Sequence, residues 1–183
     1  MTKKLFFLLF LFAALVGAGN RVVHRTVGGG TGAWSENVAY ASTDSTDTLD
    51  PDLARGGPIV AGQSGTCTKL GFGLVGWTSS ITVKIAALDA SGVPLSSETV
   101  TISSDPGNGR YEITLSTPFA ATSGTTYNVE LVSSTTQNIL RYLASQPSGS
   151  GKYATTTYAG FPDNPTTLNN HPSAWCVSMY IVP

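Results

Sequence analysis

The sequence predicts an all-β protein whose main body is an antiparallel β-sandwich. Apolar and polar residues alternate with a period of two in several runs, as they do in strands that bury one face. Clusters of Gly, Pro, Asn, Asp and Ser separate these runs and are typical of turns. Of the 183 residues, 41% are apolar and only 11% are charged. This composition argues against a disordered chain, because disorder requires low hydrophobicity and high net charge.

The first segment, residues 1–19, has the pattern of a cleavable secretory signal peptide. Lys3 and Lys4 precede an apolar run from Leu5 to Val16, and small residues follow the run. The run is shorter than the ~20 apolar residues that a membrane-spanning helix needs, so we expect cleavage rather than the alternative, an uncleaved anchor. The mature chain would then be secreted, extracellular or at the cell surface, with no membrane insertion.

Residues 20–33 form a short N-terminal arm with a glycine-rich hinge, ahead of a single sandwich domain over residues 34–183. The arm is rich in β-branched residues, and the glycines that follow it favour a flexible joint. We expect either a disordered tail or a strand that pairs with the sheet edge of a neighbouring copy. The residues of this candidate exchange strand are Val22, Val23, Thr26 and Val27.

Five runs in the body predict strands with one apolar face. Their apolar positions are Leu70, Phe72 and Leu74; Ile81, Val83 and Ile85; Tyr111, Ile113 and Leu115; Tyr127, Val129 and Leu131; and Trp175, Val177, Met179 and Ile181. Residues 137–145 are ambiguous, because their apolar positions fit a helical turn as well as a strand. Short strands at this spacing, with no helical pattern between them, are typical of a β-sandwich.

Secretion predicts a disulfide between the two cysteines, Cys67 and Cys176, because extracellular compartments are oxidising. Both positions fall on the polar face of their predicted strands, so both thiols should point the same way relative to the core. A bridge between neighbouring strands requires this orientation. The alternative is two unpaired thiols.

The stretch from residue 60 to residue 132 contains a series of turn and core motifs. They are Ala61-Gly62-Gln63-Ser64, Thr68-Lys69-Leu70-Gly71-Phe72, Val83-Lys84-Ile85-Ala86-Ala87-Leu88-Asp89, Gly92-Val93-Pro94, Leu115-Ser116-Thr117-Pro118 and Ser123-Gly124-Thr125-Thr126-Tyr127. This stretch resembles the jelly-roll-like β-sandwich modules of bacterial secreted and surface proteins and of phage tail-associated proteins. The resemblance implies a jelly-roll-like fold and a role in adhesion, carbohydrate contact or structural spacing. It brings no catalytic residues.

The sequence contains no pattern that predicts an enzyme or a nucleic-acid partner. His24 lies in the arm, and His171 lies in a Pro-rich loop with no Gly-x-Ser-x-Gly motif to supply a nucleophile. Glu112 and Glu130 fall on the outward faces of their predicted strands, where acids keep a sheet soluble rather than form a glycosidase pair. The 10 Lys+Arg against 11 Asp+Glu provide no basic surface for phosphates.

An acidic segment is a candidate metal site. Asp44, Asp47, Asp50 and Asp52 bring four carboxylates into nine residues, although the EF-hand pattern is absent. Either this segment binds calcium or it is an ordinary solvated turn. No other cofactor is expected.

Four aromatic residues are candidate glycan contacts: Trp77, Tyr153, Tyr158 and Phe161. Trp77 lies in a predicted turn, and the other three lie in a C-terminal stretch rich in Gly, Ser and Thr. Their rings either stack on sugars or cover the open ends of the sandwich.

These observations predict a non-enzymatic, secreted structural or adhesive protein. Its partners would be further copies of itself, joined into a pilus-like homopolymer through the N-terminal strand, because head-to-tail contacts that do not close generate filaments. The alternative function is that of a carbohydrate-binding β-sandwich module, with glycans as partners.

Overall fold

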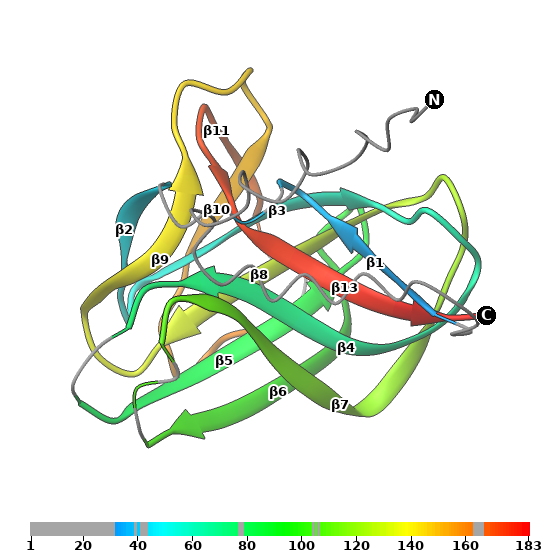
Figure 1. Cartoon of the computed structure of the whole chain (residues 1–183). Coiled ribbons are helices and arrows are strands. Elements are labelled where there is room, and N and C mark those ends of the chain that lie inside the picture. The colour runs from blue at the N-terminus through cyan, green and yellow to red at the C-terminus, as the bar shows by residue number, and fades with distance from the viewer. Residues whose placement is uncertain are drawn as a thin grey trace, which may run out of the picture.

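A computed structural model of the chain describes residues 32–38, 40, 44–76, 79–103, 105, 107–162 and 167–183. Over these residues the protein is all-β, and its strands form two antiparallel sheets packed face to face (Figure 1). The predicted β-sandwich is therefore confirmed. The predicted signal peptide and residues 20–31 of the arm lie outside the described residues. Among the residues that are described, no helix is long and apolar enough to cross a membrane.

Sheet A contains seven strands and sheet B contains six. In sheet A the order is β1 (Ala33–Glu36), β13 (Val177–Val182), β4 (Gly65–Leu74), β9 (Gln137–Leu143) and β12 (Ala174–Trp175), with β2 (Ser45–Leu49) paired to β9 and β7 (Gly109–Ala121) paired to β4. In sheet B the order is β11 (Asn169–His171), β10 (Gly151–Thr155), β3 (Leu53–Val60), β8 (Thr126–Ser133), β5 (Ile81–Leu88) and β6 (Pro94–Ile102).

Eight of these strands have the topology of a jelly roll. β1 pairs with β13, β3 with β8, β4 with β7 and β5 with β6, so that the first of the eight lies beside the last and the rest are nested inside them. The remaining strands are additions: β2 follows β1, and β9 to β12 are inserted between β8 and β13. The additions lie together at one end of the sandwich (Figure 1).

The predicted apolar faces meet in one core between the sheets. Every apolar position of the five predicted runs is buried there, apart from Tyr111, which is partly buried against it. In the ambiguous stretch 137–145, the residues up to Leu143 form strand β9 rather than a helical turn, because β2 pairs along it from Ser45 to Leu49. The first strand of the described chain, β1, begins at Ala33, one residue before the predicted start of the domain.

The long edges of the two sheets meet where β6 lies against β7. Ser96 Oγ on β6 donates a hydrogen bond to the carbonyl of Thr117 on β7 (2.6 Å). In the other direction, the backbone N–H of Ser116 on β7 donates to the carboxylate of Glu98 on β6. These contacts satisfy backbone groups that an open sheet edge would expose.

A second, smaller cluster of buried residues covers the outer face of sheet B. Phe161 is 2% exposed and packs there against alanines from β3, β5 and β10. The segment that carries it follows β10 and is held by Lys84 on β5. The Lys84 ammonium donates to the carbonyls of Ala159 (3.2 Å) and Phe161 (3.1 Å), and it lies 4.9 Å from the ring centre of Tyr158.

The predicted solvent exposure of Glu130 is wrong. Glu130 does point away from the central core, since its neighbours Val129 and Leu131 face inward, but it is 0% exposed. On the adjacent strands its partners are Gly56 and Ala86, and Ala86 belongs to the outer cluster. The outer face of sheet B is thus buried around Glu130.

The predicted disulfide is also wrong: both thiols are buried and free. A β-bulge between Cys67 and Lys69 shifts the alternation of β4, so the Cys67 side chain enters the core instead of the polar face. Cys67 lies opposite Ile181 on β13, whereas Cys176 lies beside Gly73, whose N–H donates to its carbonyl (2.6 Å). Roughly 20 Å of strand separates these two positions, far beyond the reach of a disulfide.

Candidate functional site

A groove of about 420 Å³ opens where β12 of sheet A faces β3, β10 and β11 of sheet B. Its volume is in the range of small-ligand sites. Its lining residues are Leu53, Arg55, Tyr153, Asn170, His171, Pro172 and Trp175. Two of them lie on β3, and the other five lie within the insertion between β8 and β13. The jelly-roll strands therefore support a groove that the added strands largely build.

Strand register brings the groove residues together. Tyr153 on β10 lies opposite Arg55 on β3, so the two side chains stand next to each other on the same face of sheet B. His171 on β11 lies opposite Gly151 on β10. A Cβ atom at Gly151 would come within 2.7 Å of the Trp175 ring, so the absence of a side chain there lets the indole approach β10.

Three rings form a contiguous aromatic wall. The ring centres of His171 and Trp175 lie 4.6 Å apart, and those of Tyr153 and His171 lie 5.9 Å apart with an edge-to-face arrangement. Trp175 is 1% exposed and forms the buried part of this wall, whereas Tyr153 and His171 are half-buried. The N–H of Ser173 donates to His171 Nδ1 (3.0 Å), which leaves Nε2 to carry the ring proton of the neutral imidazole.

Charged side chains fix the inner end of the groove. The Arg55 guanidinium forms an ion pair with Asp47 on β2, and Arg55 Nη2 lies 3.7 Å from Asp50 Oδ2. The same Asp47 carboxylate accepts a hydrogen bond from Trp175 Nε1 (3.0 Å). Arg55 Cζ also lies 5.8 Å from the centre of the Trp175 ring. Charge-assisted bonds of this kind hold planar groups in a defined orientation.

The four acids of the predicted calcium site do not converge. Asp47 and Asp50 face Arg55, Asp52 is exposed, and Asp44 Oδ2 accepts a contact from the thiol of Cys176 (3.5 Å). Over the described part of the chain, no group of three or more His, Cys, Asp or Glu residues is arranged to hold a metal ion. The acids near the groove instead balance an arginine.

The predicted glycan contacts separate into different places. Tyr153 lies in the groove, whereas Tyr158 and Phe161 pack over the outer face of sheet B. Trp77 lies outside the described residues. Sequence reasoning missed Arg55, Asn170 and the place of His171 in the groove, since it put His171 only in a Pro-rich loop without a nucleophile motif. A usable signal was the concentration of ring and amide side chains in residues 169–175.

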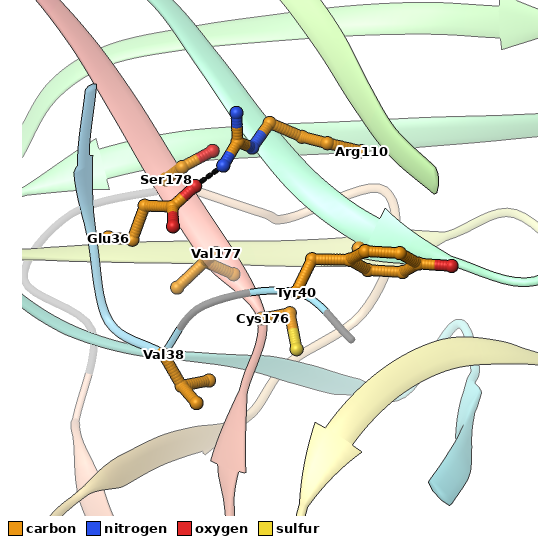
Figure 2. A pocket seen from close by; sticks show the side chains of 8 residues that line it. Glu36, Val38, Tyr40, Arg110, Cys176, Val177 and Ser178 are labelled. Atoms are coloured by element: carbon orange, nitrogen blue, oxygen red, sulfur yellow. Dashed lines mark ion pairs between the residues drawn. The ribbon is translucent and has the colours of Figure 1, made fainter. Parts of the chain in front are cut away.

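A second depression lies on the outer face of sheet A and is filled by its own side chains (Figure 2). Arg110 pairs there with Glu36, and its guanidinium lies 5.0 Å from the ring centre of Trp34. The depression leaves no room for a ligand. Cys176 faces it, and burial, reinforced by Asp44, raises the pKa of the thiol to about 12, so the thiol is a poor nucleophile.

Glu130 is a buried carboxyl outside the groove. Burial raises its pKa to about 8, although Lys152 acts in the opposite direction. Among the residues that the structure describes, neither of its oxygens has a hydrogen-bond partner. An isolated carboxyl beneath a covering segment does not form the pair of carboxylates that glycoside hydrolysis uses.

Comparison with known protein families and with curated proteins finds no match for this chain. Arguments about its function therefore rest on the groove and on the sequence.

Proposed function

We propose that the protein is a non-enzymatic, secreted adhesive β-sandwich that binds carbohydrate in the groove between β12 and the β3–β10–β11 part of sheet B. The observation that carries this proposal is the combination of half-buried rings with fixed hydrogen-bonding groups in one groove of about 420 Å³. The signal-peptide pattern of residues 1–19 supports secretion.

The chemistry of the groove suits a sugar, which has both apolar C–H faces and many hydroxyl groups. Tyr153, Leu53 and Pro172 offer apolar surface for the C–H faces. The Nε2 of His171 offers a hydrogen bond for a hydroxyl group.

The groove is also organised in advance of binding. The edge-to-face contact with His171 restricts the Tyr153 ring, and the bond from Ser173 restricts His171. Binding then orders few additional side chains, which lowers its entropic cost. The two carboxylates nearest the groove, Asp47 and Asp50, are engaged by Arg55 and are not presented as an acid–base pair. This engagement supports binding rather than hydrolysis.

A glycan array probed with the purified protein tests the proposal, followed by calorimetry on the best ligand. Tyr153→Ala should weaken binding roughly tenfold or more, because a central aromatic contact is lost, and Tyr153→Phe should retain most of it. Tyr158→Ala is the matched control, since Tyr158 lies over the outer face of sheet B. Loss of binding in Tyr158→Ala but not in Tyr153→Ala would place the site elsewhere, and an array without any bound glycan would refute the proposal.

A second candidate function is self-association into a filament through the N-terminal arm. One observation favours it: β1 is the outer strand of sheet A, so its first residue, Ala33, lies at a sheet edge (Figure 1). A strand from one copy could extend the sheet of another there. Deletion of residues 20–31 leaves β1 intact and should abolish filaments seen by negative-stain microscopy. Unchanged filaments after the deletion would refute strand exchange.

A further inference from the structure

We propose that the groove selects uncharged sugars and disfavours glycans that bear carboxylate or sulfate groups. This inference rests on the proposed carbohydrate-binding function and names the class of sugar for the same site. It follows from how the charges around the groove are already matched, rather than from the aromatic wall.

Arg55 is the arginine that lines the groove, and two carboxylates surround it. Asp47 pairs with its guanidinium, and Asp50 lies 3.7 Å from Nη2. The formal charge of these three side chains together is therefore negative. An acidic sugar would meet a guanidinium whose charge Asp47 already balances, and the excess carboxylate would repel it.

A ligand anion would not easily displace Asp47. Its Oδ2 accepts from both Arg55 and the Trp175 indole N–H, so two donors hold the same oxygen. Displacing it would leave a buried indole N–H without an acceptor, and an unsatisfied buried donor is costly. The ion pair therefore behaves as a fixed part of the groove wall, not as a recruitable anion site.

The other polar groups of the groove are neutral. His171 accepts at Nδ1 from Ser173, which suits the uncharged imidazole. Asn170 lies opposite Lys152 in the pairing of β10 with β11, and its Oδ1 accepts from the Lys152 ammonium (2.6 Å), so the two side chains share one face of sheet B. Lys152 alternates with Tyr153 along β10 and therefore lies on the opposite face of the strand. The groove thus presents a neutral imidazole and rings, which match the hydroxyl groups and C–H faces of an uncharged sugar.

The test compares neutral oligosaccharides with uronate, sialylated and sulfated counterparts of equal length, by array and then by calorimetry. The wild-type chain should bind the neutral series more tightly, by about tenfold or more. Tighter binding of the acidic series would overturn the inference while leaving carbohydrate binding intact. Binding of neither series would refute the proposed function and the inference with it.

A charge variant provides the second part of the test. Asp50→Asn keeps an oxygen for the Asp52 N–H but removes one of the two charges beside Arg55, so the ratio of neutral to acidic affinity should fall about three- to tenfold. Asp52→Asn makes the same charge change at an exposed position and should leave the ratio unchanged. Equal effects of the two variants would mean that net charge, not the pairing of Arg55, sets the preference. Circular dichroism and urea unfolding confirm that each variant is folded.

Discussion

Arg55 on β3 and Asp47 on β2 form an ion pair that joins sheet B to sheet A at the inner end of the groove. The pair is partly buried, with side-chain exposures of 16% and 26%. The Asp47 carboxylate also accepts a hydrogen bond from the indole of Trp175, whose strand, β12, belongs to the inserted segment. One acid therefore connects β2, β3 and β12.

Asp47→Ala should destabilise the protein by about 1–3 kcal/mol, because it leaves both the Arg55 guanidinium and the Trp175 N–H without their acceptor. Urea unfolding followed by tryptophan fluorescence measures the change. Asp52→Ala is the control and should stay within about 0.5 kcal/mol of wild type, since Asp52 is exposed. Equal losses in the two variants would show that the ion pair contributes little.

Glu130 should make the protein less stable as the pH rises from about 5 to 9. In the folded state its pKa is about 8, against 4.5 for an ordinary glutamate, so the unfolded chain loses this proton first. Over that interval the free energy of the unfolded chain falls relative to that of the folded protein. Glu130→Gln removes the effect and should be more stable than wild type at pH 9 by about 3–5 kcal/mol, with little difference at pH 5.

Urea unfolding at both pH values gives this comparison, and Glu112→Gln is the control. Glu112 is paired with Lys69 at 3.5 Å and is partly exposed, so its replacement should not change the slope of stability against pH. If wild type and Glu130→Gln showed the same dependence of unfolding free energy on pH, Glu130 would not be a buried neutral carboxyl.

The two cysteines should react slowly with an exposed-thiol reagent until the protein unfolds. Burial raises the pKa of both Cys67 and Cys176 to about 12, so little thiolate is present and reagent has no access to it. Labelling followed by intact mass should find two free thiols after denaturation without reductant. A mass two hydrogens lighter, with no label taken up, would show that a disulfide forms.

Gly151→Ala should destabilise the groove end of the sandwich by more than about 2 kcal/mol and weaken glycan binding. Its Cβ would overlap the carbonyl oxygen of Ser173 and lie 2.7 Å from the Trp175 ring, so β10 and β12 would have to separate. Gly109→Ala is a matched control, because no atom of the described residues lies within 4 Å of a Cβ at Gly109. Similar stability of the two variants would contradict the close approach.

The fold could be predicted from the sequence because its strands bury one face each. Runs such as Leu70, Phe72 and Leu74 carry the period of two that a half-buried strand requires, and all three residues lie in the core. Periodicity failed at Cys67, because one extra residue in the bulge reverses which face a side chain takes. That reversal cannot be seen in the pattern of one strand alone.

Burial of Glu130 and the composition of the groove depend on contacts between distant segments. Glu130 looks outward by alternation, and its burial depends on a segment about 30 residues later in the chain that packs over the same face of sheet B. Tyr153 could be named as a candidate from its polar, glycine-rich surroundings. Its neighbour Arg55 is nearly 100 residues earlier and could be placed beside it only by the pairing of β3 with β10.

The seam between β6 and β7 limits how copies of this protein could join. Ser96 and Glu98 already form hydrogen bonds with the backbone of β7. An added strand would have to break both bonds before it could pair with the backbone of either edge strand. Growth by strand addition would be directed away from this side, toward the margin that begins at Ala33. In any fibre built this way, every sandwich would keep its β6–β7 flank free of added strands.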